Sequence, residues 1–323
     1  MEVAELSRKS EAYGFDCFWV NETKHDPFLQ LAIAANSTGK IGVGTSIALA
    51  FTRSPTTIAY TAWDLQNISG GRLVLGLGSQ VKGHIERRFG MQWQPPAPKM
   101  KEVVLTLRSI WQSWQDGSRL DFQGRFFQID LMTPFFSPGR IENPNIPIYI
   151  AGVNEGMCRV AGAVADGLHV HPLHTVKYLR EVIDPALTLG ATRAGRKRSD
   201  VIVAASVFAA VGRSESEIRE SREALRGKIA FYASTRTYSK VLKIHGWEGV
   251  GEKLHSLSMK GEWQNMPKEV GDDMLEEFVV EGTWEEIGAK IKRRYEGLVD
   301  RVRLYAPFDG KAEWRDLVRG FRA

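Results

Sequence analysis

The chain has 323 residues, of which 43% are hydrophobic and 25% charged, as in an ordinary globular protein that can bury a full core. Its formal charge of +5 is spread along the whole chain without a polybasic arm, which argues against nucleic acid as a partner. The two cysteines have no metal-binding or redox spacing, and no signal-peptide-like or membrane-spanning apolar run occurs, so we expect a cytoplasmic protein with no membrane partner.

Short apolar runs alternate with segments of helical periodicity, which is typical of parallel βα units. Ser54 before Pro55 is a helix start signal, and Thr283 with Glu286 forms a second one. The predicted elements, in chain order, are helix 3–13, strand 15–20, helix 27–38, strand 41–49, helix 55–68, strand 73–78, helix 97–114, strand 146–152, helix 155–164, strand 167–170, helix 176–189, strand 201–211, helix 215–231, helix 283–296 and strand 299–305.

Seven strands and eight helices predict an α/β protein of the (β/α)8 TIM barrel class, as one domain over residues 1–323. The first strand is missing from the front or displaced. Either the chain begins about a dozen residues late, or Met1 is the true start and another segment covers the gap. An open doubly wound sheet is the alternative. Two insertions, at about 92–147 and 232–273, are expected to wall the pocket.

Short motifs between Glu11 and Gly78 resemble the luciferase-like monooxygenase superfamily in their order and spacing, and Ala151-Gly152 and Ala165-Asp166-Gly167 continue the likeness. Within that superfamily the sequence looks most like the F420-dependent oxidoreductases. The resemblance implies hydride transfer between C5 of the deazaflavin F420 and a small organic substrate, and a homodimer formed through the early helices. The motifs are Tyr13-Gly14-Phe15-Asp16, Trp19-Val20-Asn21-Glu22, His25-Asp26-Pro27, Ile41 to Ile47, Ser54-Pro55, Ser69 to Leu73 and Gly76-Leu77-Gly78.

The same resemblance implies where the cofactor binds. Thr45-Ser46-Ile47 matches the place where F420-dependent members carry a non-prolyl cis peptide that supports one face of the cofactor ring. Glycines at the strand ends allow close backbone approach to a ligand, and Gly152 is expected to begin a helix whose amides can bind an anion. Lys82, Arg87 and Arg88 are candidates for the polyglutamate tail. The predicted cofactor-binding residues are Thr45, Ser46, Ile47, Gly78, Ser79, Gln80, His84, Ala151, Gly152 and Val153.

His25 and Glu22, which follow the predicted strand 15–20, are the candidate catalytic residues. An imidazole can donate or accept a proton near neutrality, and Glu22 can set its tautomer or act itself. Val81 stands where related dehydrogenases carry an acid, which puts their sugar-phosphate chemistry in doubt. The predicted walls of the substrate pocket are Trp19, Phe51, His169 and His171, with Phe135 and Phe136 in the first insertion.

Three other functions stay open. A reduced-FMN-dependent luciferase-like monooxygenase would share the barrel, and so would a non-catalytic cofactor-binding protein. His169-Val170-His171, with His174 and Asp309, also fits part of the pattern of a barrel metallohydrolase. In those enzymes the His-x-His pair follows the first strand rather than the sixth, so we expect no metal.

Overall fold

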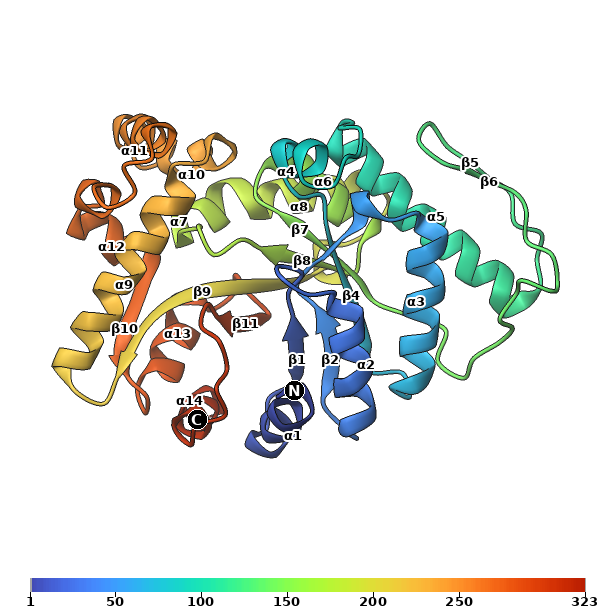
Figure 1. Ribbon diagram of the computed structural model, residues 1–323, viewed down its shortest axis with the longest axis horizontal. Coiled ribbons are helices and arrows are strands. Elements are labelled where there is room, and N and C mark those ends of the chain that lie inside the picture. Colours follow the sequence, from blue (N-terminus) through green and yellow to red (C-terminus); the bar gives the residue numbers. More distant parts are fainter. Residues whose placement is uncertain (1, 323) are drawn as a thin grey trace. The chain divides into compact units, whose positions relative to one another are not determined.

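The computed structural model describes residues 2–322; Met1 and Ala323 lie outside the described residues, as does the prediction about Met1 as the start. The chain divides into two compact units. Figure 1 shows its helices and strands. Unit 1 holds the residues up to Gly152 together with Gly156–His169 and Leu187–Val201, and unit 2 holds Val153–Glu155, Val170–Ala186 and the chain from Ile202 onward.

Helices and strands alternate along most of the described chain. The helices are α1 Val3–Tyr13, α2 Pro27–Ser37, η1 Ala50–Thr52, α3 Pro55–Ile68, α4 Lys82–Arg87, α5 Pro96–Asp116, α6 Glu155–Val164, α7 Val176–Tyr178, η2 Leu179–Ile183, α8 Asp184–Arg193, η3 Arg198–Asp200, α9 Glu215–Ala233, η4 Arg236–Tyr238, α10 Ser239–Lys243, α11 Glu248–Lys260, η5 Met266–Glu269, α12 Asp272–Phe278, α13 Ile287–Tyr295 and α14 Glu313–Arg322. The strands are β1 Cys17–Val20, β2 Gly42–Thr45, β3 Ala48–Leu49, β4 Leu73–Gly78, β5 Phe122–Gln123, β6 Gln128–Ile129, β7 Ile148–Gly152, β8 Gly167–Val170, β9 Ile202–Gly212, β10 Val279–Thr283 and β11 Arg301–Leu304.

The sheet of unit 1 has the order β1-β2-β4-β7-β8, with β3 beside β4. The pairs β1 with β2, β2 with β4, β3 with β4 and β4 with β7 are parallel. Every residue of β4 is buried, as expected for a central strand covered on both faces. Parallel pairing places the carboxyl ends of these strands at one edge of the sheet, where sites in such folds form.

A long excursion follows α5 and contains the β5–β6 hairpin, which projects beyond α5 at the right of Figure 1. The Glu102 carboxylate on α5 accepts hydrogen bonds from the backbone N–H groups of Arg125, Phe126 and Phe127, at 3.0, 2.7 and 3.3 Å. One carboxylate therefore fixes the hairpin to the helix.

In unit 2 the long strand β9 pairs in parallel with two partners. Its first half pairs with β11, from Ala204 with Arg301 onward, and its second half pairs with β10, from Phe208 with Val279 onward. Tyr305 continues the β11 edge by donating its N–H to the Val207 carbonyl at 2.8 Å. The side chains just after β11 are thereby held next to the middle of β9.

The seven predicted strands are all present, and the bounds of α1, α3, β4, α6 and β8 are as predicted. Ser54 caps α3 by accepting the Thr57 N–H at 3.1 Å, with Pro55 at the first position, as expected. The predicted helix start at Thr283 is wrong, because Thr283 ends β10, which was not predicted, and α13 begins at Ile287. One contact of the predicted box is present, since the Glu286 carboxylate accepts the Thr283 N–H at 3.5 Å. Val279–Thr283 forms a strand because its backbone pairs with β9. This pairing joins segments far apart in the sequence, so the local pattern did not predict it.

No helix within residues 2–322 combines the length and the apolar character that a membrane crossing requires.

Candidate functional site at the strand ends

The carboxyl ends of β1, β2, β3 and β4 are joined by backbone hydrogen bonds. The Ser46 N–H donates to the Val20 carbonyl at 2.8 Å, and the Glu22 N–H donates to the Ile47 carbonyl at 3.1 Å. A Cβ on Gly78 would lie 2.5 Å from Cδ1 of Ile47, so the two residues are in contact. The structure thus brings Glu22, Ser46, Ile47 and Gly78 together at one edge.

The peptide bond between Ser46 and Ile47 is cis. This confirms the non-prolyl cis peptide that the resemblance implied for Thr45-Ser46-Ile47. Both Ser46 and Ile47 are half-buried.

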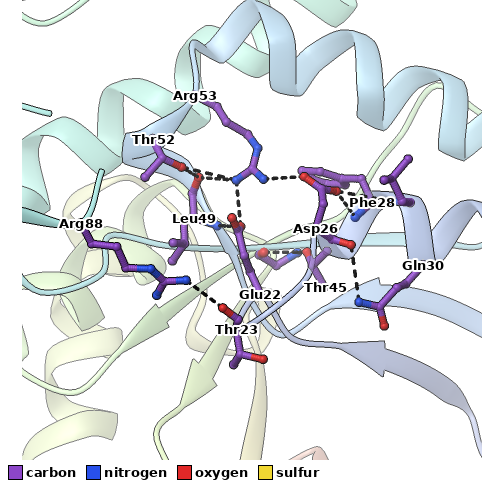
Figure 2. Close-up of polar contacts among 12 residues, drawn as sticks. Glu22, Thr23, Asp26, Phe28, Gln30, Thr45, Leu49, Thr52, Arg53 and Arg88 are labelled. Carbon is purple, nitrogen blue, oxygen red and sulfur yellow. Dashed lines mark hydrogen bonds and ion pairs between the residues drawn. The ribbon is translucent and has the colours of Figure 1, made fainter. Parts of the chain in front are cut away.

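Arg53, which follows η1, ties the loop after β1 to the end of β3 (Figure 2). Its Nη1 donates to the Glu22 carboxylate and its Nη2 to the Asp26 carboxylate, both at 2.8 Å. Burial acts to lower the Arg53 pKa, but the hydrogen bonds and charges of Glu22 and Asp26 outweigh it and raise that pKa. Asp26 also caps α2 by accepting the Phe28 N–H at 2.8 Å. The cation therefore fixes the loop at two points.

His25 lies in this loop between the two carboxylates and is exposed. The same Glu22 oxygen that meets Arg53 also accepts the Leu49 N–H at 2.7 Å. The structure thus gives the Glu22 carboxylate a positioning role, with Arg53 and Leu49 as its partners. Whether Glu22 or His25 moves a proton stays a prediction.

The loop after β4 turns sharply. Gln80 has a φ of 60°, and its own side-chain Oε1 accepts the Val81 N–H at 2.9 Å. Ser79 and Gln80 are half-buried, whereas His84 on α4 is exposed. Two of the basic residues here have protein partners: Lys82 pairs with Glu86 at 3.9 Å, and Arg88 donates to the Thr23 carbonyl at 2.8 Å.

The Cβ positions of the glycines in β4 are filled by protein atoms, and the expectation that their backbone also meets a ligand stays a prediction. A Cβ on Gly76 would lie 1.9 Å from the Thr45 carbonyl oxygen and 2.8 Å from Nε2 of His169. The Thr45 side chain is fully buried, and its hydroxyl donates to the Gly76 carbonyl at 2.6 Å and accepts the Gly76 N–H at 2.9 Å. Thr45 therefore joins β2 to β4 through its side chain, and its predicted contact with the cofactor stays a prediction.

Gly152 ends β7 rather than beginning a helix, because α6 starts three residues later at Glu155. A Cβ on Gly152 would lie 2.8 Å from Cδ1 of Leu168, so this glycine also accommodates a protein side chain. Ala151 is half-buried at the end of β7. Val153 belongs to unit 2, where its carbonyl accepts the Tyr178 hydroxyl at 3.1 Å.

Two predicted pocket residues pack against each other in unit 1. The Trp19 ring meets the His169 ring edge-on with 4.9 Å between centroids, and Tyr149 lies 5.3 Å from His169. Phe51 is also buried, with the Lys99 ammonium 4.8 Å from its ring centroid. Phe135 and Phe136, by contrast, are exposed and contact each other at 5.1 Å.

His171 belongs to a different group of side chains, in unit 2. Its ring stacks on Tyr238 at 4.3 Å and meets Tyr232 edge-on at 4.7 Å. The Tyr232 and Tyr305 hydroxyls are hydrogen-bonded to each other, and Arg303 donates from Nε and Nη2 to the Ser206 hydroxyl at 3.0 and 2.7 Å. We call this group the tyrosine cluster; its members are His171, Ser206, Tyr232, Tyr238, Arg303 and Tyr305.

Within the part of the chain that the structure describes, no three His, Cys, Asp or Glu side chains are grouped so that they could hold a metal ion. Asp309, the acid in the metallohydrolase hypothesis, accepts from Nε1 of Trp314 at 2.9 Å and pairs with Lys311 at 2.8 Å.

Sequence reasoning missed Arg53 and most of the tyrosine cluster. Arg53 directly precedes the Ser54 helix cap, and this position beside a strand end was a usable signal. For Tyr232 and Tyr238 the only signal was their place in the second predicted insertion. Tyr305 was predicted as the end of a strand, and nothing local indicated that it would meet Tyr232.

Comparison with known families gives the arrangement its context. The luciferase-like monooxygenase family pattern matches residues 1–301. The chain belongs to the luciferase-like monooxygenase family. An uncharacterized protein of Mycobacterium tuberculosis is 46% identical to this family member over 299 residues, which is 93% of this chain and 88% of the relative. The 5,10-methylenetetrahydromethanopterin reductase of Archaeoglobus fulgidus is 28% identical over 315 residues, covering 95% and 90%.

Solved structures show the fold of this luciferase-like family member. The coenzyme F420-dependent tetrahydromethanopterin reductase of Methanopyrus kandleri matches with a TM-score of 0.78 and 23% identity, over 99% of this chain and 93% of that chain. An F420-dependent secondary alcohol dehydrogenase matches with a TM-score of 0.75 and 21% identity, over 99% and 94%. The predicted α/β fold class is thereby confirmed.

Proposed function

We propose that this protein is an F420-dependent oxidoreductase that transfers a hydride between C5 of the deazaflavin and a small organic substrate. The observation that carries the proposal is the likeness, along nearly the whole chain, to the A. fulgidus reductase and to the F420-dependent reductase structure of M. kandleri. The strand-end site of unit 1, which contains the cis Ser46–Ile47 bond, carries side chains whose chemistry suits such a cofactor.

The side chains at this site suit such a cofactor in their chemistry. Ser46, Ser79 and Gln80 are half-buried hydroxyl and amide groups, which can exchange hydrogen bonds with the polar edge of a deazaflavin ring. Lys82 and Arg87 on α4 bring positive charge, which suits a phosphodiester and a glutamate tail. These residues would hold the cofactor.

A bound deazaflavin supplies hydride donation or acceptance at C5. The chain supplies position and protons. His25 is exposed on the loop after β1, where its imidazole can exchange the proton that accompanies the hydride. Arg53 holds that loop through Glu22 and Asp26, so the backbone that carries the His25 imidazole is fixed on both sides.

A reduced-FMN monooxygenase is the second candidate, because the family to which the chain belongs is described by monooxygenase activity. The experiment that separates the two is a fluorescence titration of the purified protein with F420 and with FMN, followed by turnover under anaerobic conditions. We expect F420 to bind at least about tenfold more tightly than FMN. With a small carbonyl compound added as the hydride acceptor, we expect reduced F420 to be oxidised without oxygen, as its C5 hydride and a proton pass to the carbonyl group. Tighter binding of FMN with oxygen-dependent turnover would establish the second candidate, and failure of both cofactors to bind a folded protein would contradict the proposal.

A matched pair of variants separates binding from proton transfer. His25→Asn is expected to keep F420 affinity within about twofold while turnover falls about 100-fold, the usual contribution of a general acid or base. Lys24→Asn, which changes the preceding exposed residue of the same loop, serves as the control. Equal turnover in both variants would remove His25 from the reaction.

A further inference from the structure

The tyrosine cluster of unit 2 gathers polar groups from four separate segments. His171 follows β8, Tyr232 lies on α9, Tyr238 lies in η4, and Tyr305 follows β11. Each of these four side chains is half-buried, so part of each stays exposed. The residues follow the carboxyl ends of two strands of a parallel fold, which is where binding groups collect. The cluster is absent from the residues assigned above to the cofactor.

His171 is fixed as a neutral hydrogen-bond donor. Its Nδ1 accepts the Leu173 N–H at 3.1 Å, so in the neutral ring the proton sits on Nε2. Burial lowers the pKa of His171 to about 3, and electrostatic interactions with His174 and Arg303 act in the same direction. The ring therefore presents an N–H at any physiological pH, rather than a group that switches.

The paired phenols of Tyr232 and Tyr305 offer a second donor. One hydroxyl donates a hydrogen bond to the other. The accepting hydroxyl can still donate a hydrogen bond of its own to a ligand. Burial, followed by the hydrogen bond with Tyr305, raises the pKa of Tyr232, and burial raises the pKa of Tyr238 to about 12. These phenols thus stay protonated near neutrality.

Two cationic side chains lie close to these donors. Arg303 places its guanidinium beside the Tyr232 and Tyr305 pair, and Lys228 lies with its ammonium 5.4 Å from the Tyr305 ring centroid. In the described residues, no aspartate or glutamate is among the groups that shift the pKa of His171, Tyr232 or Tyr238. An array of fixed N–H and O–H donors under a positive potential matches an acceptor oxygen.

We propose that the tyrosine cluster binds a carboxylate or carbonyl oxygen of a small organic ligand, with the Tyr238, Tyr232 and His171 rings in contact with its apolar body. The proposal names the substrate class for the function proposed above and rests on that function only in treating the ligand as a substrate. The donors are His171 Nε2–H and the free hydroxyl proton of the phenol pair. The carboxylate is the stronger ligand, because the potential adds to the hydrogen bonds.

The test is a calorimetric titration of the full chain with three probes of one size: benzoate, benzamide and benzylamine. They carry an anionic acceptor, a neutral acceptor and a cation without an acceptor. We expect the affinities to fall in that order, with at least about a tenfold gap between benzoate and benzylamine. Equal affinity, or preference for benzylamine, overturns the proposal with no variant needed.

Variants then locate the binding. A single substitution of Tyr232 or Tyr305 by Phe would leave the other hydroxyl able to bind the ligand. The informative variant therefore combines Tyr232→Phe with Tyr305→Phe, which removes both hydroxyls and keeps both rings. This double variant is expected to lose benzoate affinity about tenfold. Tyr60→Phe in unit 1, a half-buried tyrosine whose hydroxyl donates to the Phe136 carbonyl at 2.6 Å, is the matched control and should bind benzoate as the parent does. Unchanged benzoate affinity in a folded double variant overturns the assignment.

A parallel F420 titration keeps the two proposals apart. The double Tyr→Phe variant should bind F420 as the parent protein does, because none of the cluster is among the residues proposed to hold the cofactor. If the parent protein fails to bind F420, the proposed function alone is contradicted. If the parent protein does not prefer benzoate to benzylamine, the proposal for the tyrosine cluster alone is contradicted.

Discussion

The strand-end site of unit 1 and the tyrosine cluster of unit 2 are stabilised in opposite ways. In unit 1, two carboxylates share one guanidinium: Arg53 joins Glu22 and Asp26 at 2.8 Å each. In unit 2, burial drives the imidazole of His171 to its neutral form, the phenols of Tyr232 and Tyr305 bond to each other, and the one guanidinium of the cluster, Arg303, donates to the neutral Ser206 hydroxyl. The first region is built from ion pairs around an exposed histidine, and the second from neutral imidazole and phenol donors beside the guanidinium of Arg303.

This difference indicates a division of labour. An exposed imidazole on an ionically fixed loop can exchange protons with solvent, which a proton-transfer group needs. A neutral donor held by aromatic rings cannot titrate near neutrality, so it can only position and polarise. The comparison makes three further predictions, which run from the largest expected effect to the smallest.

The closest backbone approach in unit 1 is at Gly76, and its substitution should have the largest effect. Gly76→Ala places a Cβ 1.9 Å from the Thr45 carbonyl, a backbone atom that cannot swing away, so we expect a loss of about 4 kcal/mol in unfolding free energy or failure to fold. Chemical denaturation measures it. Gly39→Ala, where a Cβ meets nothing within 4 Å, is the control and should change stability by less than about 0.5 kcal/mol. Similar losses in the two variants would contradict the close packing of β2 on β4.

His174 in unit 2 should make stability depend on pH. Burial lowers its pKa to about 4, and the Arg294 charge acts in the same direction, although the hydrogen bond to the His171 carbonyl opposes them. The unfolded chain takes up a proton near pH 6.5 and the folded chain only near pH 4. Stability is therefore full above about pH 6.5 and declines as the pH falls toward 4, by on the order of 3 kcal/mol.

His174→Gln keeps a donor for the His171 carbonyl and removes the titration. Denaturation between pH 4.5 and 7.5 should show a shallower decline in this variant than in the parent. His25→Gln, at an exposed position of unit 1, is the control. An unchanged slope in His174→Gln would show that His174 is solvated in solution.

Arg53→Met tests the ionic network and should have the smallest effect of the three. It leaves the Glu22 side chain, 10% exposed, without its cation, so we expect a loss of about 2 kcal/mol in unfolding free energy. In a Glu22→Gln background the same change should cost clearly less, because no carboxylate is left unpaired. Equal costs in both backgrounds would mean that Arg53 acts by packing alone.

Local patterns predicted much of this chain correctly because their causes are local. The alternation of apolar runs and helical periodicity located the strands of the main sheet other than β10, and Ser54 with Pro55 marked the start of α3. The motif around Thr45-Ser46-Ile47 identified the cis peptide bond. Gathering of Glu22, Ser46, Ile47 and Gly78 followed from parallel topology, since parallel strands end at one edge.

The sequence by itself determined the βα order, the family likeness and which residues stand at strand ends. Only the tertiary structure decided what those residues contact. In the tertiary structure Glu22 pairs with Arg53, and protein atoms fill the space beside Gly76 and Gly78. Val279–Thr283 pairs with β9, and the Tyr232 hydroxyl bonds to that of Tyr305. The physical reason is that periodicity and capping act over a few neighbouring residues, whereas these contacts join positions at least 31 residues apart, and no local preference specifies such pairs.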